Sequence, residues 1–135
     1  MISLFLLFLA GALNATMDVL SFRYNTSIFS KYPKLQSFFN PQESWVNKYK
    51  DNNPNLGPKF FGSKTFLVFL TDAWHLAKTL MITLFTLSIV FYNPIIVTES
   101  IFVNIAGNLL LLHSAFSLTF ELFFSKILIK KKVII

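Results

Sequence analysis

The chain has 135 residues, of which 54% are hydrophobic and 17 are phenylalanine, and it carries a net charge of +6 with no cysteine. Soluble domains are about 45–50% apolar. A water-soluble fold of this composition would leave large apolar patches exposed, so lipid is the better solvent. The lack of cysteine excludes disulfides, thiolate metal ligands and cysteine nucleophiles.

The basic residues are distributed asymmetrically. They flank apolar stretches and do not line one helix or groove, which argues against nucleic acid as a partner. All except Lys78 fall in segments that lie on one side of a three-span arrangement, and short basic loops stay in the cytoplasm. We therefore predict an outside N-terminus and a cytoplasmic C-terminus, closed by Lys130–Lys132, with the lysines contacting anionic lipid headgroups.

The first predicted span covers residues 2–22, which is enough to cross the roughly 30 Å hydrocarbon layer as a helix. A cleaved signal peptide is the competing interpretation. It is disfavoured because no basic residue precedes the apolar run, and because Leu13 occupies a position where a cleavage site needs a small residue. We expect a retained helix.

The central polar segment, residues 23–64, is predicted to fold on the cytoplasmic surface. Asn40 is a good helix N-cap, followed by Pro41 at the first helical position and Glu43 at the third. A helix running to about Lys50 would place Trp45 on the same face as Tyr49, beside two lysines. This arrangement suits an interfacial helix in the headgroup layer.

The second predicted span covers residues 66–92, and Asn93-Pro94 ends it. The third covers residues 97–127. The short connection between them predicts an antiparallel helical hairpin. The expected fold is an all-α integral membrane bundle of three transmembrane helices, forming a single domain over residues 1–135.

Ionisable residues inside membrane spans are costly and mark functional sites by default. Five of them are expected to gather near the cytoplasmic face: Asp18, Asp72, His75, His113 and Glu121. Asp72 and His75 are three residues apart and share a helix face. Counted from the flanking lysines, His75 and His113 come within about 5 Å of the same depth.

Several kinds of chemistry fit this cluster. Asp-x-x-His resembles the Glu-x-x-His pairs of bundle metal sites. Asp18, His113 or Glu121 would complete a shell for zinc, manganese or iron, which would activate water against a lipid or isoprenoid headgroup. Haem ligation by the two histidines is disfavoured because nothing marks propionate anchors. A proton or ion path would need an oligomer, and the same residues also serve simply to tie helices together.

Two sequence blocks carry a family resemblance. They run from Asn40 to Lys50 (NPQESWVNKYK) and from Thr71 to Lys78 (TDAWHLAK). Both are similar to blocks in a group of small bacterial and phage polytopic membrane proteins without an assigned activity. The resemblance implies that the blocks belong to one unit, with the central segment folding over the Asp72/His75 end.

The function predicted from the sequence is a non-catalytic oligomeric or accessory component of the bacterial inner membrane. Its polar cluster would hold helices together, and a second copy or a membrane complex would be its partner. A metal-dependent membrane enzyme and a proton- or ion-conducting oligomer remain open as alternatives.

Overall fold

The computed structural model describes residues 1–130, which are mostly helical and contain no β-strand. Three long helices dominate: α1 (Ile2–Arg23), α4 (Ala73–Val90) and α5 (Ile101–Leu122), the last extended by a π-helical turn, η7 (Phe123–Ile127). Each of the three is long and apolar enough to cross a membrane. The predicted cytoplasmic end of the chain at Lys131 and Lys132 lies outside the described residues.

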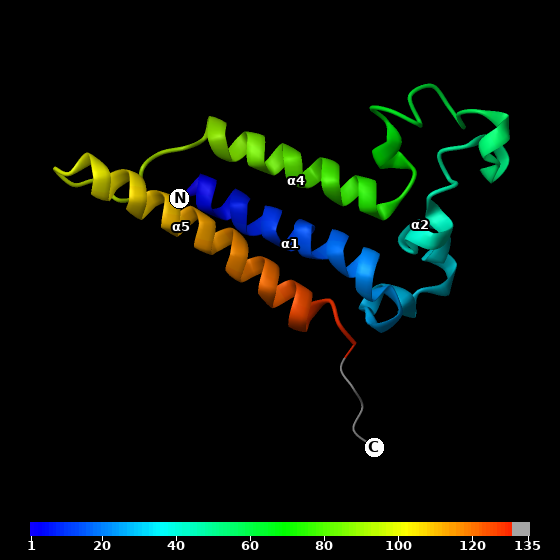
Figure 1. Ribbon diagram of the computed structural model, residues 1–135, viewed down its shortest axis with the longest axis horizontal. Helices are drawn as coiled ribbons and strands as arrows, with labels where there is room; N and C mark the ends of the chain where they lie inside the picture. Colours follow the sequence, from blue (N-terminus) through cyan, green and yellow to red (C-terminus); the bar gives the residue numbers. More distant parts are fainter. Residues whose placement is uncertain (131–135) are drawn as a thin grey trace, which may run out of the picture.

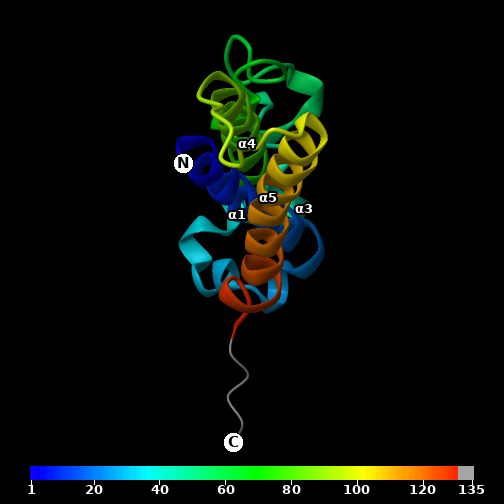
Figure 2. The ribbon, with the colours of Figure 1, turned by 90° about the vertical axis from the view of Figure 1, so that its left-hand side faces the viewer.

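α1 is the central helix of the bundle and packs against both α4 and α5 (Figure 1, Figure 2). Small residues make this close packing fit, since Ala10 and Ala15 are fully buried and a Cβ built on Gly11 would overlap the carbonyl oxygen of Phe116. α4 and α5 run antiparallel but meet directly mainly at the Phe85 and Phe116 rings, whose centroids are 5.3 Å apart. The predicted antiparallel hairpin is therefore right in direction, but its two helices do not pack along their length, because the small-residue faces of α1 fit between them.

The helix boundaries depart from the predicted spans in specific places. α1 covers the first predicted span, residues 2–22, and one residue more. The second begins seven residues later than predicted, at Ala73, because the Asp72 side chain caps α4 and residues 66–72 form turns and the short 3-10 helix η6 (Val68–Leu70). The third begins at Ile101, behind the N-cap Ser100. Delayed helix starts shorten both spans at their N-terminal ends.

The connection between α4 and α5 is bound to the first turns of α5 by two asparagines. The Asn108 carboxamide is 3% exposed; it accepts from the backbone N–H groups of Ile95 (2.7 Å) and Ile96 (3.1 Å) and donates to the Ile96 carbonyl (2.8 Å). Asn104 accepts from the N–H of Thr98 (2.6 Å) and donates to its carbonyl (2.9 Å). Irregular backbone near lipid needs such partners, so these side chains bind this connection and do not join helices.

Residues 24–72 form a folded collar at the end of the bundle where α1 ends and α4 begins (Figure 1). The collar is joined to the end of α5, since the Ile28 N–H donates to the Leu128 carbonyl and the Lys130 N–H donates to the Thr26 carbonyl, both at 2.9 Å. Besides η6, its short helices are η1 (Tyr24–Thr26), η2 (Ile28–Lys31), η3 (Pro33–Leu35), α2 (Gln36–Phe39), α3 (Pro41–Ser44), η4 (Lys50–Asn52) and η5 (Pro54–Leu56).

The helix predicted from Pro41 to about Lys50 is wrong in length. The N-cap is confirmed, because the Asn40 side chain accepts from the Gln42 N–H, but α3 ends at Ser44. Beyond Ser44, the Asn47 side chain donates to two backbone carbonyls in other parts of the collar. The Lys48 carbonyl accepts from the backbone N–H of Lys59 at 2.9 Å. These tertiary contacts replace the next helical turn.

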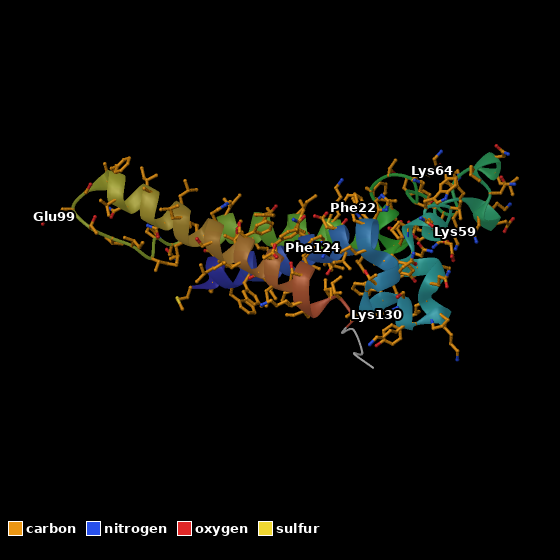
Figure 3. All side chains as sticks on the ribbon, turned by 60° about the horizontal axis from the view of Figure 1, so that its bottom comes forward. Phe22, Lys59, Lys64, Glu99, Phe124 and Lys130 are labelled. Atoms are coloured by element: carbon orange, nitrogen blue, oxygen red, sulfur yellow. The ribbon has the colours of Figure 1, made fainter. Side chains whose placement is uncertain are left out.

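Charge is segregated along the bundle. Every Lys and Arg in residues 1–130 except Lys78 belongs to the collar or to the helix ends that meet it, whereas Glu99 lies at the opposite tip (Figure 3). The Arg23 guanidinium lies 4.0 Å from the centre of the Phe124 ring, so the charge at the end of α1 also lies at the collar end of the bundle.

Candidate functional site

The strongest polar contact in the bundle is the pair formed by Asp72 and His75 at the start of α4. The Asp72 carboxylate is 3% exposed and accepts from the His75 backbone N–H at 2.9 Å. The same carboxylate contacts the His75 ring, with Nδ1 at 2.7 Å from Oδ2 and 2.9 Å from Oδ1. Because a carboxylate only accepts, the His75 Nδ1 carries the proton in this contact.

Local sequence explains this geometry. Asp72 has an extended backbone (φ −157°, ψ 160°), so its side chain folds over the first turn of α4 and satisfies an N–H that the helix leaves unpaired. The Thr71 hydroxyl lies 3.1 Å from Asp72 Oδ2. Asn47 donates from its Nδ2 to the Thr71 carbonyl at 3.0 Å and to the Ser37 carbonyl at 2.7 Å. The collar thereby fixes the residue before the cap.

A cavity of about 170 Å³ opens beside this pair, between α1, α3 and α4. It is also lined by Ser21, Pro41, Ser44, Trp45 and Trp74. The Trp74 ring stands edge-on to the His75 ring with centroids 5.1 Å apart, so one side of the imidazole is covered by an aromatic surface. The prediction that the collar folds over the Asp72/His75 end is confirmed by this lining.

The other three candidate residues are not part of this pair. Asp18 is half-buried on α1, and within residues 1–130 its carboxylate has no hydrogen-bond or ion-pair partner. His113 is exposed on α5, with Nε2 3.3 Å from the Ser117 hydroxyl. Glu121 is exposed near the end of α5 and accepts from the Ser125 hydroxyl.

The predicted match in depth between the two histidines is wrong. His75 lines the same cavity as Ser21, while Gly11 lies against Phe116, so the two levels are ten residues apart along α1. His113 precedes Phe116 by three residues and lies that much further from the collar. The two histidines are therefore about thirteen residues apart in level, or about 20 Å along the bundle at 1.5 Å per residue. The cause is the late start of α4, which keeps His75 at the collar end.

This donor set does not fit a metal ion. The part of the chain that the structure describes holds no group of three His, Asp, Glu or Cys side chains that would coordinate one. Both Asp72 oxygens and the His75 Nδ1 already serve the cap, which leaves Nε2 as the single available ligand atom. Structural zinc sites need four ligands and catalytic ones three.

The sequence-based analysis missed the residues that support the pair. Asn47 and Thr71 lie in a polar segment where no periodicity marks them, and their contacts span 24 residues. Ser21 and Ser44 became cavity residues only through tertiary packing. The one available signal was the Thr-Asp-x-x-His spacing, which is as typical of a helix N-cap as of a ligand pair.

The chain is thus an all-helical protein with three helices suited to a membrane and one polar pair capping the second of them. Comparisons with protein-family models, with curated proteins and with solved structures gave no match for this chain.

Proposed function

We propose that the chain is a non-catalytic component of a membrane assembly, anchored by three helices and held in one orientation by its collar on the cytoplasmic leaflet. The observation that carries this proposal is the segregation of charge, with the described basic residues around one folded end and Glu99 at the other. Because basic segments stay on the cytoplasmic side, the collar faces the cytoplasm, which in a bacterium means the inner face of the inner membrane.

The collar has the composition of a headgroup-binding surface. It carries six lysines, of which five are exposed, against three acidic residues, including the buried Asp72. The lysines are Lys31, Lys34, Lys48, Lys50, Lys59 and Lys64. Each lysine close to an anionic membrane surface contributes about 1 kcal/mol of attraction, so a collar of this kind favours bilayers that contain anionic lipid.

Aromatic rings are interleaved with these lysines, as in the interfacial belts of membrane proteins. The Tyr49 ring meets Trp45 edge-on at 6.2 Å and has the ammonium groups of Lys48 and Lys64 at 5.6 and 5.4 Å from its centre. Trp45 is 49% exposed. This cluster supports a collar that rests in the headgroup layer, with its cations directed at lipid phosphates.

The Asp72/His75 pair supports a structural role for the polar residues. The carboxylate completes a helix cap and the imidazole is bonded to it, so both groups contribute to holding α4 against the collar. A capping carboxylate near the membrane surface satisfies backbone that lipid would leave without partners.

Orientation is tested with single cysteines, since the chain has none of its own. Asn53→Cys in the collar and Glu99→Cys at the opposite tip are both substitutions at exposed positions. In intact cells, a membrane-impermeant maleimide is expected to label the Glu99→Cys variant alone, and the Asn53→Cys variant only after lysis. Labelling of the Asn53→Cys variant in intact cells would contradict the proposal.

Lipid preference is tested by tryptophan quenching. Trp74→Phe leaves Trp45 as the single tryptophan. In mixed phosphatidylcholine/phosphatidylglycerol vesicles, quenching by brominated phosphatidylglycerol is expected to exceed quenching by brominated phosphatidylcholine. Replacing the six collar lysines with glutamine should equalise the two. Equal quenching with the lysines present would remove headgroup binding from the proposal.

A further inference from the structure

Asp18 of α1 and Lys78 of α4 lie within membrane spans, and the described fold gives neither of them a counter-ion. Glu121 of α5 also lacks a counter-ion, but its carboxylate accepts from the Ser125 hydroxyl. The salt bridge between His75 and Asp72 is the one ion pair among residues 1–130. The Lys78 ammonium instead lies 5.1 Å from the centre of the Trp74 ring. Ionisable side chains in membrane spans pair with one another or face a protein interior, so both groups call for a partner.

The two residues lie at the same level of the bundle. Ser21 of α1 and His75 of α4 line one cavity and so mark a common height. Asp18 and Lys78 are each three residues further from the collar than these markers, which is about 4.5 Å at 1.5 Å per residue.

The two residues also lie on the same side of the bundle. Successive residues of a helix are turned by about 100° about its axis. Around the axis of α1, Asp18 is therefore about 20° from Gly11, which contacts α5. It is about 60° in the other direction from Ser21, which faces the start of α4. It therefore sits on the arc of α1 between α4 and α5. Lys78 is about 20° around α4 from Phe85, whose ring meets Phe116 across that same gap. We call this surface the Asp18–Lys78 face.

We propose that the Asp18–Lys78 face is the interface between two copies of this chain, related by a two-fold axis along the membrane normal. One negative and one positive group at equal depth are self-complementary, since the axis places Asp18 of each copy against Lys78 of the other. The inference rests on the proposed function in one respect: a single orientation makes the two copies parallel, which the two-fold axis requires.

A membrane interface of this kind gives each charge a partner without water. The flank of α4 that carries Lys78 is exposed, so a second copy has access to it. The exposed His113 lies on the same side of α5 as Phe116, about 60° away, and a second copy also covers that side of the histidine.

The test is a charge exchange between separate copies. Copies labelled with donor or acceptor dyes at Asn53→Cys are reconstituted in phosphatidylcholine/phosphatidylglycerol vesicles, and energy transfer is measured against protein density. The unaltered pair should associate. Asp18→Lys alone and Lys78→Asp alone should each raise the dimer dissociation constant about tenfold or more, because each places like charges opposite one another.

Mixing donor-labelled Asp18→Lys with acceptor-labelled Lys78→Asp should restore association, because every contact between the two copies again joins opposite charges. Pairing within one copy predicts no such rescue. Thr79→Asp is the matched control: it places a charge one residue further along α4 and about 100° away, and it should leave association unchanged. Far-ultraviolet circular dichroism confirms that each variant is folded.

Two results would overturn the interface: folded protein that stays monomeric at every density, as expected if a different membrane protein covers this face, or a mixture that associates no better than either variant alone. Its failure is separable from that of the proposed orientation. The maleimide assay reads the sidedness of positions 53 and 99 whether or not copies associate.

Discussion

Replacing Asp72 with alanine is the most direct perturbation of the polar pair, because it removes the cap of α4 and the acceptor of the His75 ring in one step. An N-cap aspartate contributes about 1 kcal/mol over alanine. The lost bond to a partly exposed imidazole adds about 1 kcal/mol. Asp72→Ala should therefore lower the free energy of unfolding by about 2 kcal/mol.

Asp72→Asn separates the two contributions. Its side-chain oxygen still accepts from the His75 N–H as an N-cap, but its charge is gone, so we expect a loss of about 1 kcal/mol or less. Unfolding is followed by circular dichroism during titration of mild micelles with sodium dodecyl sulfate. A loss below about 0.5 kcal/mol for Asp72→Ala, or equal losses for both variants, would refute the capping argument.

Two further predictions follow from the packing of α1 and the α4–α5 connection. Gly11→Val should destabilise the protein by about 1–3 kcal/mol in the same titration, because the added Cβ would overlap the Phe116 carbonyl oxygen and push α5 away. An unchanged unfolding midpoint would contradict that contact. Asn108→Leu should speed hydrogen exchange at the Ile95 and Ile96 amides at least about tenfold, because both amides lose their acceptor. Exchange as slow as in the unaltered protein would show that another group protects these amides.

The sequence was enough to predict that three long helices exist, but it did not predict the residues at which the second and third begin. Apolar length alone locates α1, α4 and α5, because a membrane span must be long and apolar. The apolar run Phe66–Leu70 is separated from α4 by Thr71 and Asp72 alone, so hydropathy places it in the span. The cap at Asp72 and the collar contact from Asn47 to Thr71 end the helix there instead, and neither is visible in a hydrophobicity pattern.

The arrangement of the helices was predicted less well than their number. A short connection suggests that α4 and α5 are direct neighbours. However, the small residues Gly11 and Ala15 let α1 pack closely, so α4 and α5 each pack against α1 and not against one another. The same late start of α4 moved His75 to the collar end and separated it from His113. Asp18, on α1, and Glu121, on α5, also lie apart from the pair, so the predicted five-residue cluster does not form.

The Asp-x-x-His spacing shows how one pattern serves two kinds of chemistry. Inside a helix it projects a carboxylate and an imidazole from one face toward a ligand. When the aspartate is the N-cap, the carboxylate instead folds back over the first turn and binds the histidine itself, through its backbone N–H and through Nδ1. Binding a metal through Asp72 would have to break those bonds and expose the first turn of α4 near lipid, where unpaired backbone is costly. The position of the helix start, and not the identity of the two residues, therefore decides that this pair stabilises α4.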